Sequence, residues 1–213
     1  MQTFTGTSGA IIVDKLILSI QRNKQYLSDI DGLIGDGDHG INMNKGFTMC
    51  REELDKNPGD LVHGLNVLSK ILIMKIGGSM GPLYGKFFKA IALSLEKKED
   101  IGIVELGNAL KAAVEAIASI SPAKIGDKTL IDTLIPAVAA FEKAQQKGKS
   151  FSEALEALKV SAREGCDSTK NMVAKLGRAS RLGERSRGVL DAGATSCYLI
   201  LETFSDSILG LIQ

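Results

Sequence analysis

The sequence predicts an all-α fold in which the helices close into one antiparallel bundle, and three observations lead to this prediction. Apolar residues recur at intervals of three and four, which is the spacing of one helix face. Alternation of apolar and polar residues over the length of a strand is hard to find. Stretches such as residues 65–76 and 129–141 are apolar over more than half of the helix circumference, so they need neighbours on several sides.

The first half of the chain is expected to contain four helices. One covers residues 9–29, and a second covers residues 42–56 after a glycine-rich turn. A third covers residues 60–75 and stops at Gly77-Gly78, because glycine is a poor helix former. Pro82 opens the fourth, since a first helical residue has no hydrogen-bond partner for the N–H that proline lacks.

The second half is expected to contain four more helices, which makes eight in all. The fifth covers residues 103–120 and the sixth covers residues 128–146. The seventh covers residues 150–175 and opens with a Ser-x-x-Glu capping box, and the last covers residues 194–211. Because there is no repeat of fixed period, Pro-rich linker or low-complexity tract, residues 1–213 are interpreted as a single domain.

Charge and cysteine content exclude several classes of function. Lys and Arg total 26 against 25 Asp and Glu, so a net charge of +1 attracts neither nucleic acid nor an anionic membrane surface. The longest apolar runs are far shorter than the roughly 18 residues of a membrane-spanning helix. Cys50, Cys166 and Cys197 are an odd set without a Cys-x-x-Cys pair, and no signal peptide opens the chain, which favours a reduced, cytoplasmic setting.

Glycine is the unusual feature of the composition. The chain has 23 glycines, whereas average usage of about 7% would give roughly 15. Thirteen of them fall in four segments, at residues 32–40, at 77–85, at Gly126 and at 177–193. These segments follow the first, third, fifth and seventh predicted helices. Because alternate helices of an antiparallel bundle end on the same side, the four segments are predicted to meet and form one site.

The first segment carries the clearest chemistry. Asp31, Asp36 and Asp38 place three carboxylates within eight residues, and without a cation they would repel one another. Oxygen ligands without cysteine suit Mg²⁺ or Ca²⁺. A Ca²⁺ loop starting at Asp36 would need glycine where the chain has Ile41, so the spacing favours Mg²⁺, which commonly binds together with phosphates. A solvated acidic turn that caps a helix remains the simpler alternative.

Other motifs leave alternatives open. The match Gly35-x-Gly37-x-x-Gly40 lacks the preceding strand of a dinucleotide fingerprint, and no Walker A motif is present. His39 is expected to donate to a phosphate, its charge favoured by the neighbouring acids, although a lone histidine is often structural. The helix start after Gly77-Gly78 fits phosphate binding or a plain helix break. Asp127 is compatible with a helix N-cap, and Arg178 with a phosphate ligand or a solvated basic face.

Taken together, the segments resemble the nucleotide-binding L subunit of dihydroxyacetone kinase, the helical partner of a substrate-binding K subunit. The resemblance covers essentially the whole chain and implies an eight-helix antiparallel barrel with a nucleotide and two Mg²⁺ at one end. It rests on five motifs in order: Gly35-Asp-Gly-Asp-His-Gly40 with Asn42-Met43, Gly77-Gly78 with Gly81-Pro-Leu-Tyr-Gly85, Gly126-Asp-Lys-Thr129, Gly177-Arg-Ala-Ser180 with Leu182-Gly-Glu-Arg-Ser186, and Asp191-x-Gly-Ala-Thr-Ser196.

The resemblance also implies roles for individual residues. Asp31, Asp36 and Asp38 would hold the metal ions that clamp the diphosphate. Two departures from the family pattern stand out, since the family commonly has Ala-Ser where this chain has Ser79-Met80, and Pro where it has Ala192. The residues that would contact the nucleotide are His39, Gly40, Ile41, Asn42, Gly78, Ser79, Met80, Thr129, Leu130, Arg178, Asp191, Ala192 and Gly193.

The activity that the resemblance implies is phosphoryl transfer of the phosphotransferase-system type. ADP would stay bound as a cofactor, a phosphohistidine-bearing M subunit would convert it to ATP, and the γ-phosphoryl would pass to dihydroxyacetone on the K subunit. Metal ions and positioned donors carry most of such chemistry, so no catalytic base or nucleophile is assigned to this chain. Two alternatives remain open: an ATP-dependent ketose kinase subunit, and a nucleotide-state sensor that acts on a partner such as a transcription regulator.

Overall fold

The computed structural model describes residues 2–212 and confirms the all-α prediction. The described residues form nine α-helices, two 3₁₀ segments and one pair of two-residue antiparallel strands, β1 (Phe4–Thr5) and β2 (Asp100–Ile101). The helical elements are α1 (Ala10–Arg22), α2 (Lys24–Ile34), α3 (His39–Lys56), α4 (Leu61–Lys75), α5 (Met80–Leu95), α6 (Ile103–Ala118), α7 (Ile131–Gln146), α8 (Phe151–Ser168), η1 (Thr169–Asn171), η2 (Arg178–Ser186) and α9 (Ala192–Leu211).

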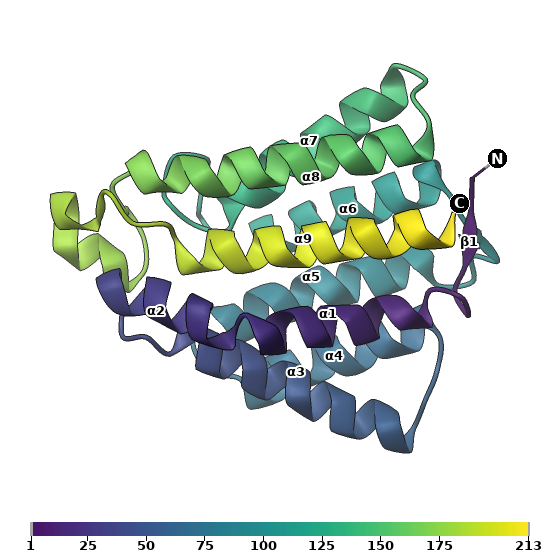
Figure 1. Cartoon of the computed structure of the whole chain (residues 1–213), viewed down its shortest axis with the longest axis horizontal. Coiled ribbons are helices and arrows are strands. Elements are labelled where there is room, and N and C mark those ends of the chain that lie inside the picture. Colours follow the sequence, from purple (N-terminus) through teal and green to yellow (C-terminus); the bar gives the residue numbers. More distant parts are fainter. Residues whose placement is uncertain (1, 213) are drawn as a thin grey trace.

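Eight of the helices close a ring. Going around it, α1, α3, α4, α5, α6, α7, α8 and α9 each contact the next, and α9 returns to contact α1. Figure 1 shows these helices lying along the long axis of the molecule, with both termini at one end and η2 at the other. The closed antiparallel bundle predicted from the apolar stretches is therefore confirmed, because each ring helix is covered by two neighbours.

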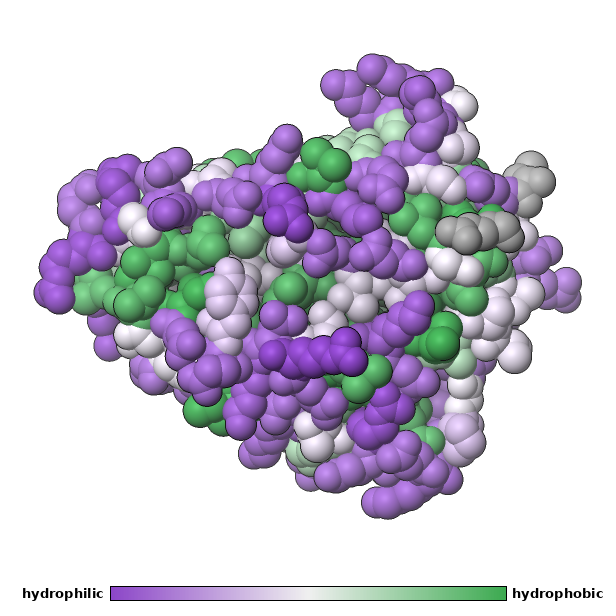
Figure 2. Space-filling model, viewed as in Figure 1, coloured by the Kyte–Doolittle hydropathy of each residue, from purple (hydrophilic) through white to green (hydrophobic). Residues whose placement is uncertain are grey.

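The interior of the ring is filled by apolar side chains from every ring helix. The fully buried Phe88 of α5 meets the rings of Phe47 and Phe87 edge-on, with ring centroids 6.1 and 5.1 Å apart respectively. The apolar stretch at residues 65–76 is not buried all round, since Ile73 and Met74 are exposed. Figure 2 shows a mostly hydrophilic face with a broad apolar area toward the end where α2 and η2 lie and further apolar areas toward the opposite end.

The first helix differs from the prediction, because residues 9–29 do not form one helix. The chain breaks at Asn23, whose side-chain Nδ2 donates to the carbonyl oxygen of Ser19 at 2.9 Å and so ends α1. A new helix, α2, starts at Lys24 and continues in the same direction to Ile34 (Figure 1). The structure thus has nine α-helices in its described part instead of eight, while the direction of every later helix is as predicted.

Other boundaries follow the sequence signals more closely. Ser150 and Glu153 form the predicted capping box, with the Ser150 N–H donating to Glu153 Oε2 at 2.8 Å. The helix that they open ends at Ser168, however, seven residues before the predicted end. The fourth predicted helix begins at Met80, two residues before Pro82, which still lies in the first turn where its missing N–H costs nothing.

Candidate functional site

The four glycine-rich segments meet at one end of the ring, around a cavity of about 860 Å³. This volume lies within the usual range of small-molecule sites. Fourteen of the sixteen residues expected at the site line the cavity. They are Asp31, Asp36, Asp38, His39, Asn42, Gly78, Ser79, Met80, Thr129, Leu130, Arg178, Asp191, Ala192 and Gly193. The prediction that the four segments meet, made from the alternating direction of the helices, is therefore confirmed, because α2, α4, α6 and α8 all end on this side.

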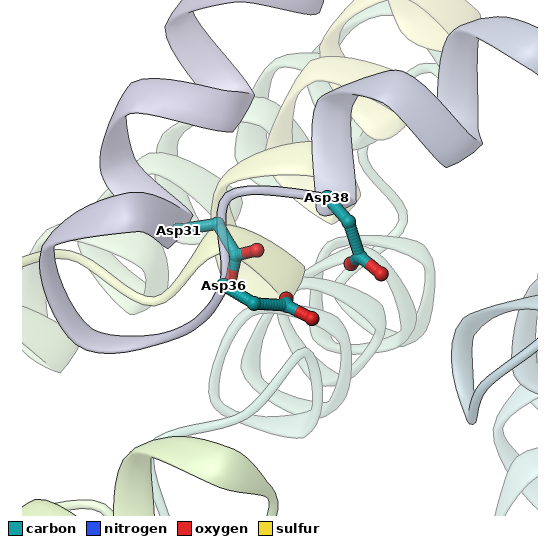
Figure 3. Close-up of side chains that lie close together, drawn as sticks. All are labelled: Asp31, Asp36 and Asp38. Atoms are coloured by element: carbon teal, nitrogen blue, oxygen red, sulfur yellow. The ribbon is translucent and has the colours of Figure 1, made fainter.

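Three carboxylates form the acidic corner of the cavity. Figure 3 shows Asp31 at the end of α2 and Asp36 and Asp38 on the loop that leads into α3, with their carboxylates directed toward a common space. One oxygen from each lies within 4.8 Å of the others. At that separation each ionised pair repels by roughly 3 kcal/mol at an effective dielectric constant of about 20. This donor set of hard oxygens fits Mg²⁺.

Arg178 supplies positive charge to this corner. It begins η2, which packs against α2, and its guanidinium forms an ion pair with the carboxylate of Asp36. None of the other three arginines that follow in residues 178–187 lines the cavity in the described structure, and Arg187 pairs with Glu184. Of the basic cluster seen in the sequence, Arg178 alone thus reaches the predicted site.

The loop between α2 and α3 owes its shape to local hydrogen bonds. The N–H of Gly35 donates to the carbonyl oxygen of Asp31 at 2.5 Å, and the N–H of His39 donates to Asp31 Oδ2 at 3.2 Å. Gly37 between them has φ +76°, a conformation that glycine adopts without strain. Asp31 therefore holds both ends of the loop and fixes where Asp36 and Asp38 lie.

Gly40 and Ile41, also expected at the nucleotide, do not line the cavity. Gly40 is buried where α3 crosses α2 closely, and a Cβ there would collide with the carbonyl oxygen of Lys24 and with Ser28. Ile41 faces away and is 53% exposed. Glycine is required at position 40 because the two helices pack closely there. From the sequence alone, a glycine needed for helix packing cannot be distinguished from one that contacts a ligand.

His39 lines the cavity from the first turn of α3, and its ring contacts a residue that does not line the cavity. Its Nε2 lies 2.9 Å from the hydroxyl of Ser196 on α9. Burial lowers the pKa of His39 to about 4, and the nearby Asp31 only partly opposes this effect. The expectation that neighbouring acids favour its charged form was wrong in net effect, because the loss of hydration outweighs the attraction.

The chain matches the DAK2 domain family model over residues 33–206. The chain belongs to the DAK2 domain family. Its relatives include the PEP-dependent dihydroxyacetone kinase, ADP-binding subunit DhaL, of Escherichia coli K12, which is 36% identical over 182 residues that cover 84% of this chain and 85% of that protein. The match therefore extends over most of both chains.

Solved structures show the same fold. The dihydroxyacetone kinase of C. freundii in its native form superposes with a TM-score of 0.72 at 23% identity, over 97% of this chain and 36% of that one. The same kinase in complex with AMP-PNP and Mg²⁺ has a TM-score of 0.66 at 24% identity and matches 93% of this chain. This DAK2 domain thus spans about a third of the length of that kinase.

Lys128 is a site residue of this DAK2 domain that sequence reasoning missed. It lines the cavity and is 1% exposed, and its Nζ donates to the carbonyl oxygens of Thr169 at 2.6 Å and Val189 at 2.5 Å. Its φ of +63° is rare for a residue with a side chain. Burial lowers the pKa of Lys128 while the nearby Asp191 opposes the shift. Lys128 therefore ties the loop before α7 to the two segments around α9.

The turn around Lys128 is closed by Asp132 and not by Asp127. Asp127, for which a helix N-cap was one of the open alternatives, accepts from the N–H of Lys124 at 2.8 Å and pairs with Lys175. Asp132, which is buried, instead accepts from the N–H groups of Gly126 at 2.5 Å and Thr129 at 2.7 Å. Asp132 closes this turn, and the backbone of Lys128 has a left-handed conformation that an α-helix does not allow. Helix α7 therefore starts at Ile131, three residues later than expected.

The start of α9 forms the last wall of the cavity. Asp191 caps the helix by accepting from the N–H of Ala194 at 2.7 Å. Burial raises the pKa of the Asp191 carboxyl to about 6, against the opposing effects of this hydrogen bond and of Lys128. Gly193 lies against Leu130, so the loop before α7 and the first turn of α9 close on the cavity together.

Proposed function

We propose that this DAK2 domain is the ADP-binding, phosphoryl-transfer subunit of a PEP-dependent dihydroxyacetone kinase. The observation that carries the proposal is the convergence of the carboxylates of Asp31, Asp36 and Asp38 with all four glycine-rich segments on one cavity. Relatives that carry this function in their names match 84% to 89% of the chain at 33% to 37% identity. A structural relative that binds AMP-PNP and Mg²⁺ has the same fold.

In this proposal Asp31, Asp36 and Asp38 hold two Mg²⁺ ions against the diphosphate. When bound, Mg²⁺ neutralises charge on the phosphoryl group being transferred. Gly77 and Gly78 leave the cavity wall bare, because no atom lies within 4 Å of where a Cβ would stand. That wall therefore offers backbone amide groups to phosphate oxygens without a side chain in the way.

Other residues would recognise the remaining parts of the nucleotide. His39 and Asn42 lie beside the carboxylates and would contact phosphate, and Arg178 would leave Asp36 for the phosphates or ribose. Leu130 would pack on the adenine, and Thr129, Ser79 and Met80 would border the nucleotide. The segment from Asp191 through Ala192 to Gly193 would close the pocket. The chain needs no nucleophile in this scheme, because its residues only bind, orient and exclude water.

The partners follow from the same proposal. A dihydroxyacetone-binding K subunit would accept the γ-phosphoryl group at the mouth of the cavity, and a phosphohistidine-bearing M subunit would restore ATP from ADP in place. These partners would place the protein in the cytoplasm. In the described residues no helix is both long and apolar enough to cross a membrane. A transcription regulator that senses the nucleotide state would be an additional partner at the same mouth.

Two measurements test the proposal. In isothermal titration, Asp36→Ala is expected to bind ADP with Mg²⁺ at least about tenfold more weakly than wild type, because one charged metal ligand contributes more than 1.4 kcal/mol. Asp55→Ala, an exposed carboxylate farther along α3, serves as the matched control and should bind as the wild type does. Equal affinity in wild type and Asp36→Ala would contradict the metal assignment.

Reconstitution tests the reaction itself. With a K subunit, an M subunit and a phosphohistidine donor, the chain is expected to form dihydroxyacetone phosphate while its ADP survives dialysis. Loss of ADP on dialysis with turnover driven by added ATP would instead indicate an ATP-dependent ketose kinase. Tight ADP binding without any product would indicate a sensor, and the phosphoryl-transfer role would then be wrong.

A further inference from the structure

A buried hydrogen-bond cluster lies directly behind His39. The Ser196 hydroxyl on α9 lies 2.9 Å from His39 Nε2 and 2.6 Å from the hydroxyl of Tyr84 on α5. Both hydroxyls also lie 3.1 Å from the carbonyl oxygen of Gly193. Ser196 is fully buried and Tyr84 is 2% exposed. The cluster therefore joins α3, α5 and α9, three elements that surround the cavity.

Counting protons decides how these groups bond. The cluster has four contacts, and the Gly193 carbonyl can only accept. The four contacts are His39–Ser196, Ser196–Tyr84, Ser196–Gly193 and Tyr84–Gly193. With a proton on His39 Nε2, the ring donates to Ser196, and the two hydroxyl protons form hydrogen bonds in two of the remaining three contacts. Without that proton, Ser196 must donate to His39, and the Tyr84 proton alone is left for the other three contacts. The Nε2–H form therefore satisfies one more buried contact, an advantage that matters where water cannot substitute.

Ser196 does not line the cavity, so any effect it has on a ligand passes through another residue. Tyr84 borders the cavity, but its hydroxyl is engaged by Ser196 and Gly193. Neither residue has another hydrogen-bonded partner on its side chain in the described structure. The role left to the pair is to fix the orientation of the His39 ring.

We propose that Ser196 and Tyr84 are positioning residues that hold the His39 ring in place and keep the neutral ring in its Nε2–H tautomer. The Nδ1 atom is then an acceptor. A neutral acceptor takes a hydrogen bond from a donor on the ligand or from an ordered water, so the contact of His39 with phosphate in the proposed function would run through a water molecule. The inference deepens the proposed function, on which it rests for the importance of His39, whereas the state of the ring is a property of the free protein.

Nuclear magnetic resonance of ¹⁵N-histidine-labelled protein tests the inference directly. The chain has only two histidines, so His63→Gln assigns the signals of His39. At neutral pH and without nucleotide, wild type is expected to show the two-bond couplings of the Nε2–H tautomer. Ser196→Ala should shift the ring toward a mixture of tautomers, and Ser196→Thr, which keeps a hydroxyl, should restore the wild-type pattern.

Ser205→Ala is the matched control for these variants. Ser205 lies on the same helix, is fully buried and has no hydrogen-bond partner on its Oγ, so its removal deletes the same atom without touching His39. It should leave the His39 signals unchanged. An Nδ1–H tautomer in the wild type, or His39 signals that Ser196→Ala leaves unaltered, would overturn the proposal.

A double-mutant cycle on ADP binding with Mg²⁺ gives the second readout. Ser196→Ala is expected to weaken binding roughly fivefold, the factor that corresponds to about one hydrogen bond. In a His39→Ala background the same change should have no effect, because the pair acts through the ring. An equal loss in both backgrounds would mean a merely structural role. If no variant binds ADP, the proposed function fails, while the tautomer measurement still decides the inference.

Discussion

At the scale of single residues, burial decides the behaviour of this site more than local charge does. The pKa of His39 falls to about 4 although a carboxylate lies beside it, and the pKa of Asp191 rises to about 6 although a lysine lies nearby. In both cases the loss of hydration is the larger effect. Asp31, Asp36 and Asp38 lie on the cavity wall within reach of a common cation.

Asp38→Asn is predicted to have opposite effects with and without Mg²⁺. In EDTA the free energy of unfolding of the variant should exceed that of wild type by about 1 kcal/mol, because one of three repelling charges is gone. Its melting temperature should therefore be higher. With Mg²⁺ and ADP it should gain less stability than wild type. Thermal denaturation under both conditions measures this, and a lower melting temperature in EDTA would argue against a repulsive cluster.

Lys128→Met is predicted to cost about 3 kcal/mol of folding stability. The change leaves the carbonyl oxygens of Thr169 and Val189 buried without their donor, which is the costly way to break a buried polar contact. Chemical denaturation measures the loss. Lys124→Met, an exposed lysine four residues earlier, should change stability by less than about 0.5 kcal/mol. Similar values for the two variants would show that the Lys128 contacts are weak.

At the scale of elements, the site depends on how closely the first turns of three helices approach their neighbours. Helix α3 starts against α2 at Gly40, α5 starts where Gly81 meets the end of α4, and α9 starts against the loop before α7 at Gly193. At Gly40 and Gly81 a Cβ would collide with the backbone of the neighbouring segment. The glycine excess of the composition thus serves close helix approach as well as open loops.

Gly40→Ala is predicted to destabilise the chain by about 1–3 kcal/mol and to weaken Mg²⁺ binding, because α3 must move away from α2 and takes the carboxylate loop with it. The control is Gly210→Ala on α9, where a Cβ meets nothing within 4 Å. That change should be neutral or stabilising by up to about 1 kcal/mol. Denaturation and metal titration of both variants provide the measurement, and a tolerated Gly40→Ala would refute the close contact.

At the scale of the whole molecule, the closed ring separates a packed interior from an open end. The ring helices bury their apolar faces against one another, while the segments after α2, α4, α6 and α8 are free to carry polar and flexible residues at one end. Six of the seven glycines with positive φ in the described structure belong to those four segments. The opposite end holds β1, β2 and short turns (Figure 1).

Amide hydrogen exchange should report this division. Addition of ADP with Mg²⁺ is predicted to slow exchange together in residues 35–42, 76–82, 126–130 and 177–193, since one ligand contacts all four segments. The turns at the opposite end, residues 96–102 and 147–150, should exchange at unchanged rates. Protection confined to one of the four segments would show that they do not form a common site.

The sequence by itself determined the all-α class, the closed antiparallel bundle, the end of the bundle that carries the site, and the acidic corner. These features depend on local periodicity, on the alternation of helix direction and on residues within one short segment, all of which can be read along the chain. Fourteen of sixteen expected residues therefore line the cavity, and the ring closes as expected.

The structure added the break at Asn23 and the role of Asp132, which local side-chain contacts decide, and the roles of Lys128 and His39, which only the tertiary packing decides. Asn23 and Asp132 act through side-chain contacts that compete with the helix pattern, which periodicity does not register. Lys128 and His39 bind partners 41 and 157 residues away. The physical reason is desolvation: the free energy of a polar group depends on what the folded chain packs around it, and that packing joins residues whose separation in sequence carries no signal.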